Sequence, residues 1–509
     1  MVGNNRKGKN DVTIEEMAAF CKKKGFVFPT AEIYSGLAGF FDFGPPGMIL
    51  KKNIKEAFWE HMVRKRSNIL GIDGSLISSF KVWKASGHVD NFVDHLIVCE
   101  KCKLQMKAEE FIEDALNIDA DGLTDDEIEK IVKENDLRCP KCNSELHIEK
   151  PLNLMFSTSV GSGKDAVKAY LRPETAQSIF INFKNIVESQ RVKLPFGIAQ
   201  QGKAFRNEIS PRNFLFRTRE FEQIEIEFFV HPEKVDDVAG FNEIEDQEIN
   251  LLTREEQAKE NPKEIKVPVK EIASRGNKWQ AYFVYLSYVW FLNHGISRDH
   301  LRVREHLKEE LAHYAKSCFD IEYKFPFGWK EIMGNADRGQ YDLKQHAKES
   351  KEKLEIYDEE SKTKVIPYVA SEPSFGVERA FLAFLFEAFE YDEERENNVL
   401  HFNPKLAPYK FGVFPLIKDE KLIKIAKEIF NNLNERYNTE YDESGTIGRR
   451  YARQDELGTP FCITVDFDSL KDESVTIRDR DTKNQIRVKI SEINEIANDL
   501  IEGKRIIKR

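Results

Sequence analysis

The stretch from Leu194 to Val230 constrains the fold of this 509-residue chain more than any other. Its residues alternate in character and are rich in Phe and Ile. Ser210-Pro-Arg-Asn213 is typical of a turn, so we predict an antiparallel hairpin. Successive side chains on a strand point to opposite faces. One face of the second strand is apolar and belongs in a core: Ile224, Ile226, Phe228 and Val230. The other face carries charges around one aromatic ring: Arg217, Arg219, Phe221, Gln223, Glu225 and Glu227.

A polar row on a strand that is otherwise built for burial indicates a cleft. The preceding strand adds Arg206 and Glu208 on one face, because they are two residues apart. An ATP site that transfers the α-phosphate needs arginines for phosphate oxygens, a ring for adenine and carboxylates for Mg²⁺. A surface ladder of ion pairs explains the hairpin alone equally well.

The helix predicted over residues 375–390 favours the ATP site. It is apolar on nearly every side and therefore buried, yet Arg379 lies in its first turn, where the helix dipole disfavours a cation. A triphosphate is a suitable partner for such an arginine. Glu372 and Ser374 lie between a predicted strand (364–371) and this helix, a common place for ligand-binding groups.

Length and composition bound the class of protein. A chain of 509 residues with 41% hydrophobic residues requires two or three domains with separate cores. The net charge of −10 argues against a protein that coats nucleic acid indiscriminately, although it is compatible with a local basic track. No window reaches the roughly 18 apolar residues of a membrane helix. The first residues are polar and basic, so we expect a cytoplasmic protein without membrane partners.

Two CxxC pairs bracket an insert in the first half of the chain. In a reducing compartment such pairs are better explained as metal ligands than as disulfides, so we predict a structural Zn²⁺ site. Its ligands would be Cys99, Cys102, Cys139 and Cys142. Inside the insert, Thr124-Asp-Asp-Glu127 is a capping box that predicts a helix over about residues 125–135. The remaining cysteines are most simply core thiols: Cys21, Cys318 and Cys462.

Two motifs resemble a known family. Phe205-Arg-Asn-Glu-Ile-Ser-Pro-Arg212, followed by Arg219-Glu-Phe221, resembles motif 2 of class II aminoacyl-tRNA synthetases, and Gly376-Val-Glu-Arg379 resembles their motif 3. Further stretches, collinear along the chain, are similar to glycyl-tRNA synthetases: Trp83-Lys-Ala-Ser-Gly-His88, Leu171-Arg-Pro-Glu-Thr-Ala-Gln177, Glu225-Ile-Glu227, Ala336-Asp-Arg338, Glu372-Pro-Ser374 and Gly445-Thr-Ile-Gly-Arg-Arg-Tyr-Ala-Arg453.

The resemblance implies an α+β fold, with an antiparallel sheet flanked by helices. It also implies a homodimer, whose interface includes the Phe43-Gly-Pro-Pro-Gly47 turn and the helix predicted over residues 48–68. It assigns ATP binding to Arg206, Asn207, Glu208, Arg217, Thr218, Phe221, Glu331, Ile332, Gly376 and Arg379, with Arg206, Glu208 and Arg379 as the catalytic set. It assigns glycine binding to Glu174, Glu225, Arg338, Glu372, Pro373 and Ser374.

The implied reaction is the ATP-dependent attachment of glycine to tRNA(Gly) through a glycyl-adenylate, with Mg²⁺ accompanying ATP. Carboxylates suit the ammonium group of glycine, and crowding around its α-carbon excludes larger amino acids. One alternative is a non-catalytic, synthetase-like nucleic-acid-binding subunit, against which Arg206, Glu208 and Arg379 count. The other is a class II synthetase for another small amino acid. Side synthesis of diadenosine polyphosphates would add to glycylation rather than replace it.

The chain divides into segments that the structure can test. We predict a disordered basic tail (1–10), a catalytic domain (11–395) with a cysteine-bounded zinc insert (97–150) and a polar and helical insertion (235–325), a linker (393–405), and an anticodon-binding α/β domain (405–509). The insertion begins with an exposed excursion (235–275), followed by helices (279–320) that carry His306 and His313 on solvated faces. In the last domain, the candidates for tRNA contacts are Arg449, Arg450, Tyr451, Arg453, Phe461, Arg478 and Arg480.

Overall fold

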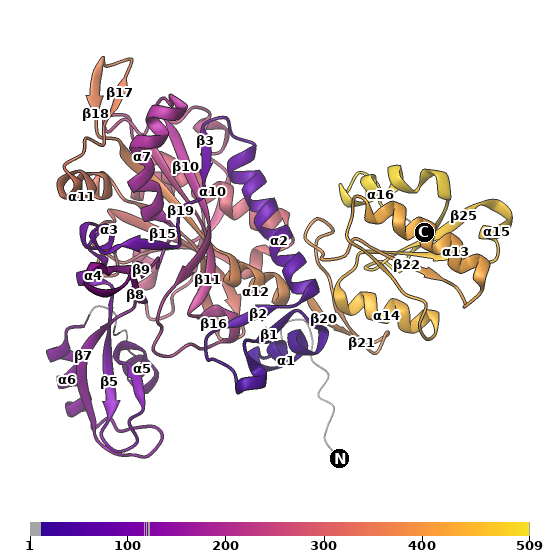
Figure 1. Cartoon of the computed structure of the whole chain (residues 1–509), viewed down its shortest axis with the longest axis horizontal. Helices are drawn as coiled ribbons and strands as arrows, with labels where there is room; N and C mark the ends of the chain where they lie inside the picture. The colour runs from indigo at the N-terminus through magenta and orange to yellow at the C-terminus, as the bar shows by residue number, and fades with distance from the viewer. Residues whose placement is uncertain (1–11, 117, 119, 121–122, 508–509) are drawn as a thin grey trace.

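The computed structural model describes residues 12–507, apart from residues 117, 119, 121 and 122, so the predicted tail over residues 1–10 lies outside the described residues. Figure 1 shows a large N-terminal body, from which the cysteine-bounded insert projects, and a smaller C-terminal body beside it. No helix among the described residues is long and apolar enough to cross a membrane.

A nine-stranded sheet organises the large body and confirms the predicted α+β class. Its order is β13 (Ile265–Pro268), β12 (Glu248–Leu252), β14 (Leu301–Glu305), β15 (Ser317–Phe325), β16 (Gly328–Asp337), β19 (Tyr368–Gly376), β11 (Glu220–Val230), β10 (Phe196–Phe205) and β3 (Ile69–Ile72). Two pairs are parallel, β3 with β10 and β12 with β14, and the other pairs are antiparallel. The predicted hairpin is β10–β11, with Ala199 opposite Ile226.

Helices cover the sheet with two apolar clusters. The apolar row of β11 packs in the main core, where α2 (Pro45–Trp59), α10 (Lys278–Asn293) and α12 (Val377–Ala388) meet through Phe58, Trp290 and Phe384. A second cluster lies between the sheet, α7 (Ala176–Gln190) and α11 (Tyr341–Ser350). The N-terminal helix α1 (Ile14–Lys24) and the short strands β1 (Val27–Pro29) and β2 (Phe41–Phe43) precede α2.

The expectation for residues 235–320 was partly wrong. The segment drawn as an exposed excursion supplies β12, β13 and α9 (Val269–Arg275) to the fold, with Ile249 and Leu251 fully buried. Of the helices expected over residues 279–320, α10 forms, but the alternating run Leu301–Glu305 is the strand β14. The charges on the loops between these short strands masked their apolar pattern.

The cysteine-bounded insert is a small domain with its own core. It contains a three-stranded sheet of β6 (Gln105–Lys107), β5 (Val93–Cys99) and β7 (Leu146–Asn153), with α5 (Ala108–Leu116) and α6 (Asp125–Glu134) packed on it. The predicted capping box is present, since the Thr124 and Glu127 side chains each accept from the other residue's backbone amide. Beside it, α3 (Phe80–Ala85), α4 (His88–Asn91) and the sheet of β4 (Ile77–Ser79), β9 (Val167–Leu171) and β8 (Ser157–Val160) connect the insert to α7.

The C-terminal body is an α/β unit with a separate core. Its sheet has the order β23 (Thr439–Tyr441), β22 (Phe411–Pro415), β24 (Phe461–Val465), β25 (Ser474–Asp479) and β26 (Gln485–Lys489), covered by α13 (Glu420–Asn434), α14 (Ile447–Leu457) and α16 (Ile493–Ile501). The segment predicted as a linker (393–405) instead contains the strand β21 (Asn397–Leu400), which forms a hairpin with the preceding β20 (Phe389–Asp392), and Phe402, which is buried in the main core.

Candidate functional site

A pocket opens on the polar side of the β10–β11 hairpin, where β15, β16, β19 and the start of α12 also meet. Residues predicted to bind ATP line it: Arg206, Glu208, Arg217, Thr218, Phe221, Glu331, Ile332, Gly376 and Arg379. So do residues predicted to bind glycine: Glu174, Glu225, Glu372 and Ser374. Of the described residues predicted to bind ATP or glycine, Asn207, Arg338 and Pro373 are outside the lining. The sheet therefore brings together groups as far apart in the sequence as Glu174 and Arg379.

One part of the pocket, which we call the arginine end, is built from Arg206, Arg217 and Arg379. The Arg206 guanidinium lies 5.2 Å from the centre of the Phe221 ring, and its Nε donates to the Pro173 carbonyl (3.1 Å). A cation held against an aromatic face keeps its remaining donors available. Arg206 is thus preorganised beside a ring, as expected for a group that binds phosphate next to a base.

Arg379 has the partner that its place in the first turn of α12 requires. Its Nη1 donates to the Glu331 carboxylate (2.6 Å) and to the Glu331 carbonyl (3.2 Å), and its guanidinium lies 4.6 Å from the Phe216 ring centre. Burial raises the pKa of Glu331, but the positive charges of Arg379 and, to a smaller extent, His306 lower it by more than that, so the net shift of the pKa is downward. Glu331 therefore remains a carboxylate, and Arg379 faces the pocket as half of an ion pair.

Arg217 pairs with a residue that the sequence did not suggest. Its guanidinium contacts the Glu110 carboxylate, and its Nε lies 3.9 Å from Glu208. Glu110 belongs to α5 of the cysteine-bounded insert and also approaches Arg212 (3.4 Å). The insert is thus in direct contact with the arginine end. An amphipathic helix gives no sequence signal for such a distant partner.

The opposite part of the pocket is lined by Glu174, Glu225 and Glu372, and two further buried acidic residues, Glu227 and Asp342, lie next to these outside the lining; we call the five the acidic end. Glu225 is fixed by three donors, since one oxygen accepts from the Thr175 amide (2.7 Å) and hydroxyl (2.6 Å) and the other from the Ser374 hydroxyl (2.9 Å). Glu174 contacts His88 Nε2 (3.2 Å) and accepts from Gln177 (3.0 Å).

Arg338 lies beneath these carboxylates. It donates to both oxygens of Asp342 (2.8 and 2.9 Å) and to Glu372 (2.5 Å), and it approaches Glu174 (3.9 Å). Among the described residues, no hydrogen-bond partner faces either carboxylate oxygen of Glu227, which is fully buried. The acidic end thus holds more buried carboxylates than the guanidinium of Arg338 can neutralise, an arrangement that attracts a further cation or protons.

Burial changes the protonation of the acidic end. It raises the pKa of Glu372 to about 8, although Arg338 opposes the rise and Glu225 adds to it. Burial also raises the pKa of Glu227 well above its usual value, and the neighbouring Glu372 adds to the rise. Both shifts favour the protonated forms of these two carboxyls. A bound ammonium group would favour their ionised forms.

Two pocket residues, His306 and Cys318, correct the sequence prediction, and Asp320 lies beside both. His306 follows β14 rather than lying on a solvated helix, and its Nε2 is 2.7 Å from Asp320. Burial lowers the pKa of His306, but Asp320 more than offsets this and the pKa rises to about 11. Cys318, predicted as a core thiol, lines the pocket next to Asp320. Each of His306, Cys318 and Asp320 has one potential metal-ligand atom, and these three atoms lie within 4.8 Å of one another. Alternation along β15 was the signal available in the sequence.

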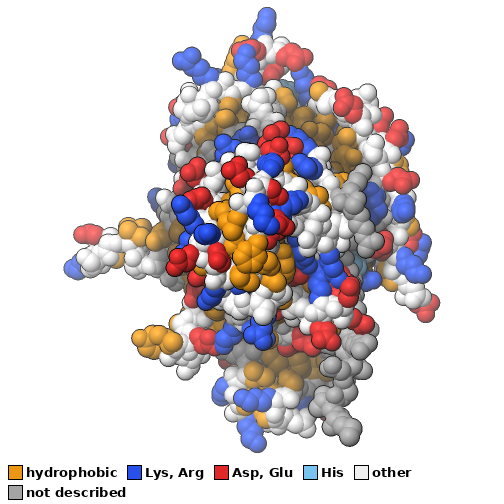
Figure 2. All heavy atoms as spheres, turned by 90° about the vertical axis from the view of Figure 1, so that its right-hand side faces the viewer, with side chains coloured by type: hydrophobic (Ala, Val, Ile, Leu, Met, Phe, Trp, Pro, Cys, Tyr) orange, Lys and Arg blue, Asp and Glu red, His pale blue; other side chains and the backbone are white. Residues whose placement is uncertain are grey.

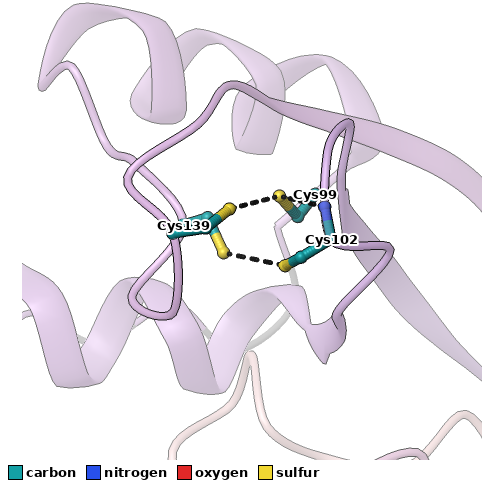
Figure 3. A group of neighbouring side chains, drawn as sticks. Cys99, Cys102 and Cys139 are labelled. Atoms are coloured by element: carbon teal, nitrogen blue, oxygen red, sulfur yellow. Dashed lines mark hydrogen bonds between the residues drawn. The ribbon is translucent and has the colours of Figure 1, made fainter.

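The four predicted cysteine ligands come together in the insert, and Figure 3 labels three of them, Cys99, Cys102 and Cys139. Cys99 Sγ lies 3.4 Å from Cys142 Sγ, Cys102 Sγ lies 3.6 Å from Cys139 Sγ, and all four sulfurs lie within 4.8 Å. Four thiolates about 2.3 Å from a tetrahedral Zn²⁺ are roughly 3.8 Å apart. The donor set and its spacing therefore fit zinc.

Several C-terminal residues predicted to contact RNA are instead internal. Arg450, Arg478 and Arg480 are buried; Arg450 and Arg480 donate to backbone carbonyls, and Arg478 pairs with Asp455. Phe461 is buried, and the Tyr451 hydroxyl bonds Thr464 (2.6 Å). Arg453 pairs with Asp442, whereas Arg449 is exposed. Charge alone did not distinguish structural arginines from surface arginines.

Figure 2 shows apolar side chains grouped among charges on the outer end of the C-terminal body, whose exposed apolar residues include Ile417, Phe467 and Leu470.

Comparisons with known proteins agree with this arrangement. Residues 162–261 match the family described as tRNA synthetase class II core domain (G, H, P, S and T), and residues 410–500 match the anticodon binding domain. The chain is 43% identical to a glycine–tRNA ligase of Clostridium acetobutylicum, over 97% of this chain and 100% of that protein. It is 44% identical to those of Geobacillus thermodenitrificans (94% of this chain and 96% of that protein) and Caldanaerobacter subterraneus (95% and 97%).

Proposed function

Since the chain belongs to the glycine–tRNA ligase family of class II aminoacyl-tRNA synthetases, we propose that its pocket joins glycine to tRNA(Gly) through a glycyl-adenylate. The observation that carries this proposal is the division of one pocket into an arginine end and an acidic end. A nucleotide triphosphate suits the first end and an ammonium group the second. Glycine and ATP would then meet between them.

The acidic end would hold the glycine ammonium. Glu225 is oriented by Thr175 and Ser374, so its carboxylate is preorganised rather than mobile. Glu174 and Glu372 complete the set, while Arg338 keeps them apart from one another in a fixed geometry. In the side-chain position of its substrate, a site so closely surrounded by protein side chains needs to admit only the hydrogen atom of glycine.

The arginine end would stabilise adenylate formation. One oxygen of the glycine carboxylate attacks the α-phosphorus in line, the bond to the bridging oxygen breaks, and pyrophosphate leaves. Arg206, fixed by Pro173 and Phe221, would stabilise the charge that develops on the α-phosphate oxygens. Arg379 would exchange Glu331 for the far phosphates. The carboxylates of Glu208 and Glu331, which line the pocket, would hold the Mg²⁺ that accompanies ATP.

Transfer to tRNA would need no further nucleophile from the protein. A terminal ribose hydroxyl of tRNA attacks the glycyl carbonyl carbon, its proton is lost, and AMP leaves with the oxygen that joined glycine to phosphorus. Diadenosine polyphosphates would form if a γ-phosphate oxygen of ATP attacked the phosphorus of the adenylate instead, which would break the bond between phosphorus and the glycyl oxygen and release glycine. Reaction mixtures without tRNA test for that second product.

The remaining parts of the chain would serve tRNA binding and stability. The cysteine cluster would hold a structural zinc that fixes the insert and therefore Glu110. Residues 405–509 would bind the anticodon through exposed groups such as Arg449, since the buried arginines are already satisfied. A homodimer would cover the apolar side chains exposed near the N-terminus, Ile33, Tyr34 and Leu37. Sedimentation as a monomer at micromolar concentration would contradict the dimer.

The experiment that tests the proposed function is amino-acid-dependent ATP–pyrophosphate exchange with each of the twenty amino acids. We expect exchange with glycine alone. Exchange with another small amino acid would identify a different class II synthetase and overturn the assignment of the acidic end. The absence of exchange with every amino acid would favour the non-catalytic subunit.

A further inference from the structure

The loop over residues 306–316, between β14 and β15, closes one side of the pocket. Five residues of this loop line the cavity: His306, Glu310, Ala312, Tyr314 and Ala315. Besides two ionisable groups, the loop therefore presents two small side chains and one large aromatic ring to the same space. None of the residues with a predicted ATP or glycine role belongs to it.

Contacts at both ends and in the middle hold this loop in place. At its start, the Leu307 amide donates to Glu310 (2.7 Å), which also pairs with Arg304. In the middle, His313 Nε2 contacts the Ser86 carbonyl (3.3 Å), and its ring packs 5.3 Å from that of Tyr341. At its end, the Lys316 amide donates to the Asp337 carbonyl (2.8 Å). A loop fixed at so many points can position a side chain reproducibly.

Tyr314 is the residue that this loop delivers to the acidic end. The centre of its ring is 3.8 Å from the guanidinium carbon of Arg338, and the Phe180 ring is 5.3 Å from the same atom. Arg338 in turn donates to Asp342 and Glu372. Tyr314 thus stacks on the guanidinium that pairs with Asp342 and Glu372 at the acidic end. The ring of Phe221, by contrast, stacks on Arg206 at the arginine end.

We propose that Tyr314 is a specificity-determining residue, whose ring forms the wall that excludes any amino acid with a side chain larger than hydrogen. Because the ring stacks on Arg338, which pairs with Glu372, its position is fixed relative to the carboxylates that would hold the ammonium group. The inference rests on the proposed function, because it assumes that the acidic end binds glycine. The carboxylates alone would bind the ammonium of alanine or serine as readily as that of glycine.

The test compares the wild type with Tyr314→Ala, Tyr314→Phe and, as a matched control, Tyr341→Ala. Tyr341 packs on the same His313 ring but does not line the pocket. ATP–pyrophosphate exchange is measured with glycine, alanine and serine, with KM and kcat for each amino acid and KM for ATP. Since one methyl group in a pocket changes discrimination by about 10- to 200-fold, removal of the wall has a measurable effect.

We expect Tyr314→Ala to raise kcat/KM for alanine relative to glycine by at least about tenfold, with KM for ATP unchanged. Tyr314→Phe, which keeps the ring, and Tyr341→Ala should retain the wild-type ratio. If Tyr314→Ala lowers glycine exchange without raising the alanine-to-glycine ratio, the role is structural and the inference is wrong. Wild-type protein that shows no glycine-dependent exchange would instead overturn the proposed function, so the two failures are distinguishable.

Discussion

The two ends of the pocket solve the problem of holding charge in opposite ways. At the acidic end the charged groups are buried, and Glu225 and Arg338 have their donors and acceptors occupied within the protein. At the arginine end the three arginines are partly exposed, and two of them are paired with a carboxylate that a phosphate can replace, Glu331 for Arg379 and Glu110 for Arg217. Protein partners thus already orient the charged groups of the acidic end, whereas Arg217 and Arg379 at the arginine end have carboxylate partners that a ligand can displace.

This difference suggests where substitutions act. A buried group whose partner is removed leaves an uncompensated charge, which costs several kcal/mol, whereas a half-exposed ion pair contributes roughly 0–1 kcal/mol. Changes at the acidic end should therefore affect glycine binding strongly and leave ATP binding alone. Changes at the two ion pairs of the arginine end should have small effects that are confined to ATP binding. Arg206 is the exception, because Pro173 and Phe221 hold it without an acidic partner.

The largest effect should come from Arg206→Ala. The guanidinium acts on charge that develops only in the transition state, so kcat for glycine-dependent exchange should fall by about 10²- to 10³-fold while KM for glycine changes little. Pyrophosphate exchange at saturating ATP measures it. Arg206→Lys is the matched control, since it keeps the charge but loses the planar fork, and it should recover part of the rate. A fall confined to KM would assign Arg206 to ground-state binding.

The next effect should come from Glu225→Gln at the acidic end. The substitution places an amide nitrogen among donors from Thr175 and Ser374 and removes a charge that faces the ammonium. Hydrogen bonds to charged groups contribute about 1.5–3 kcal/mol, so KM for glycine should rise by roughly 10- to 100-fold with KM for ATP unchanged. Steady-state exchange kinetics measure both constants. A parallel rise in both would show that the two ends are not independent.

A smaller effect should appear as a pH dependence of glycine affinity. The pKa of Glu372 in the folded protein is about 8, above the ordinary value of 4.5. The contribution of this group to the free energy of unfolding is therefore fully present below pH 4.5 and is lost as the pH rises through about 8. Glycine prefers the ionised carboxylate, so its dissociation constant should fall by about tenfold between pH 6.5 and pH 8. Calorimetry in buffers of different ionisation enthalpy would detect the proton released. A dissociation constant independent of pH would mean that Glu372 is ionised before glycine binds.

The same comparison explains what the sequence predicted and what it did not. Alternation along β11 predicted the hairpin, the apolar core face and the polar cleft face, because a strand has a fixed period of two. The CxxC spacing predicted a cysteine cluster for the same local reason. Family motifs placed Glu174, Glu225, Glu372 and Arg379 in one site, and the structure brings all four to one pocket.

The features that escaped prediction are those that depend on distant packing. Glu110 approaches Arg217 from a separate small domain, and Tyr314 reaches Arg338 from a loop whose composition is polar. Arg450 and Arg480 appeared as surface cations, yet each satisfies backbone carbonyls inside the C-terminal body. His306 was expected on a helix because Arg302-Val-Arg-Glu-His306 is charged, although Leu301 and Val303 alternate as a strand requires. Local patterns specify elements, but they do not specify the partner across the fold.

The smallest expected effect concerns the contact between the insert and the arginine end. Glu110 occupies the Arg217 guanidinium that we assign to ATP, so Glu110→Gln should free the arginine and lower KM for ATP by about threefold, consistent with an ion pair of less than about 1 kcal/mol. Initial rates of exchange at varied ATP measure the change. Asp114→Asn is the matched control, since Asp114 contacts Arg212 but not Arg217, and it should leave KM for ATP unchanged. An increase in KM for ATP would show that Glu110 positions Arg217 for phosphate rather than competing with it, and the arginine end would then be as preorganised as the acidic end.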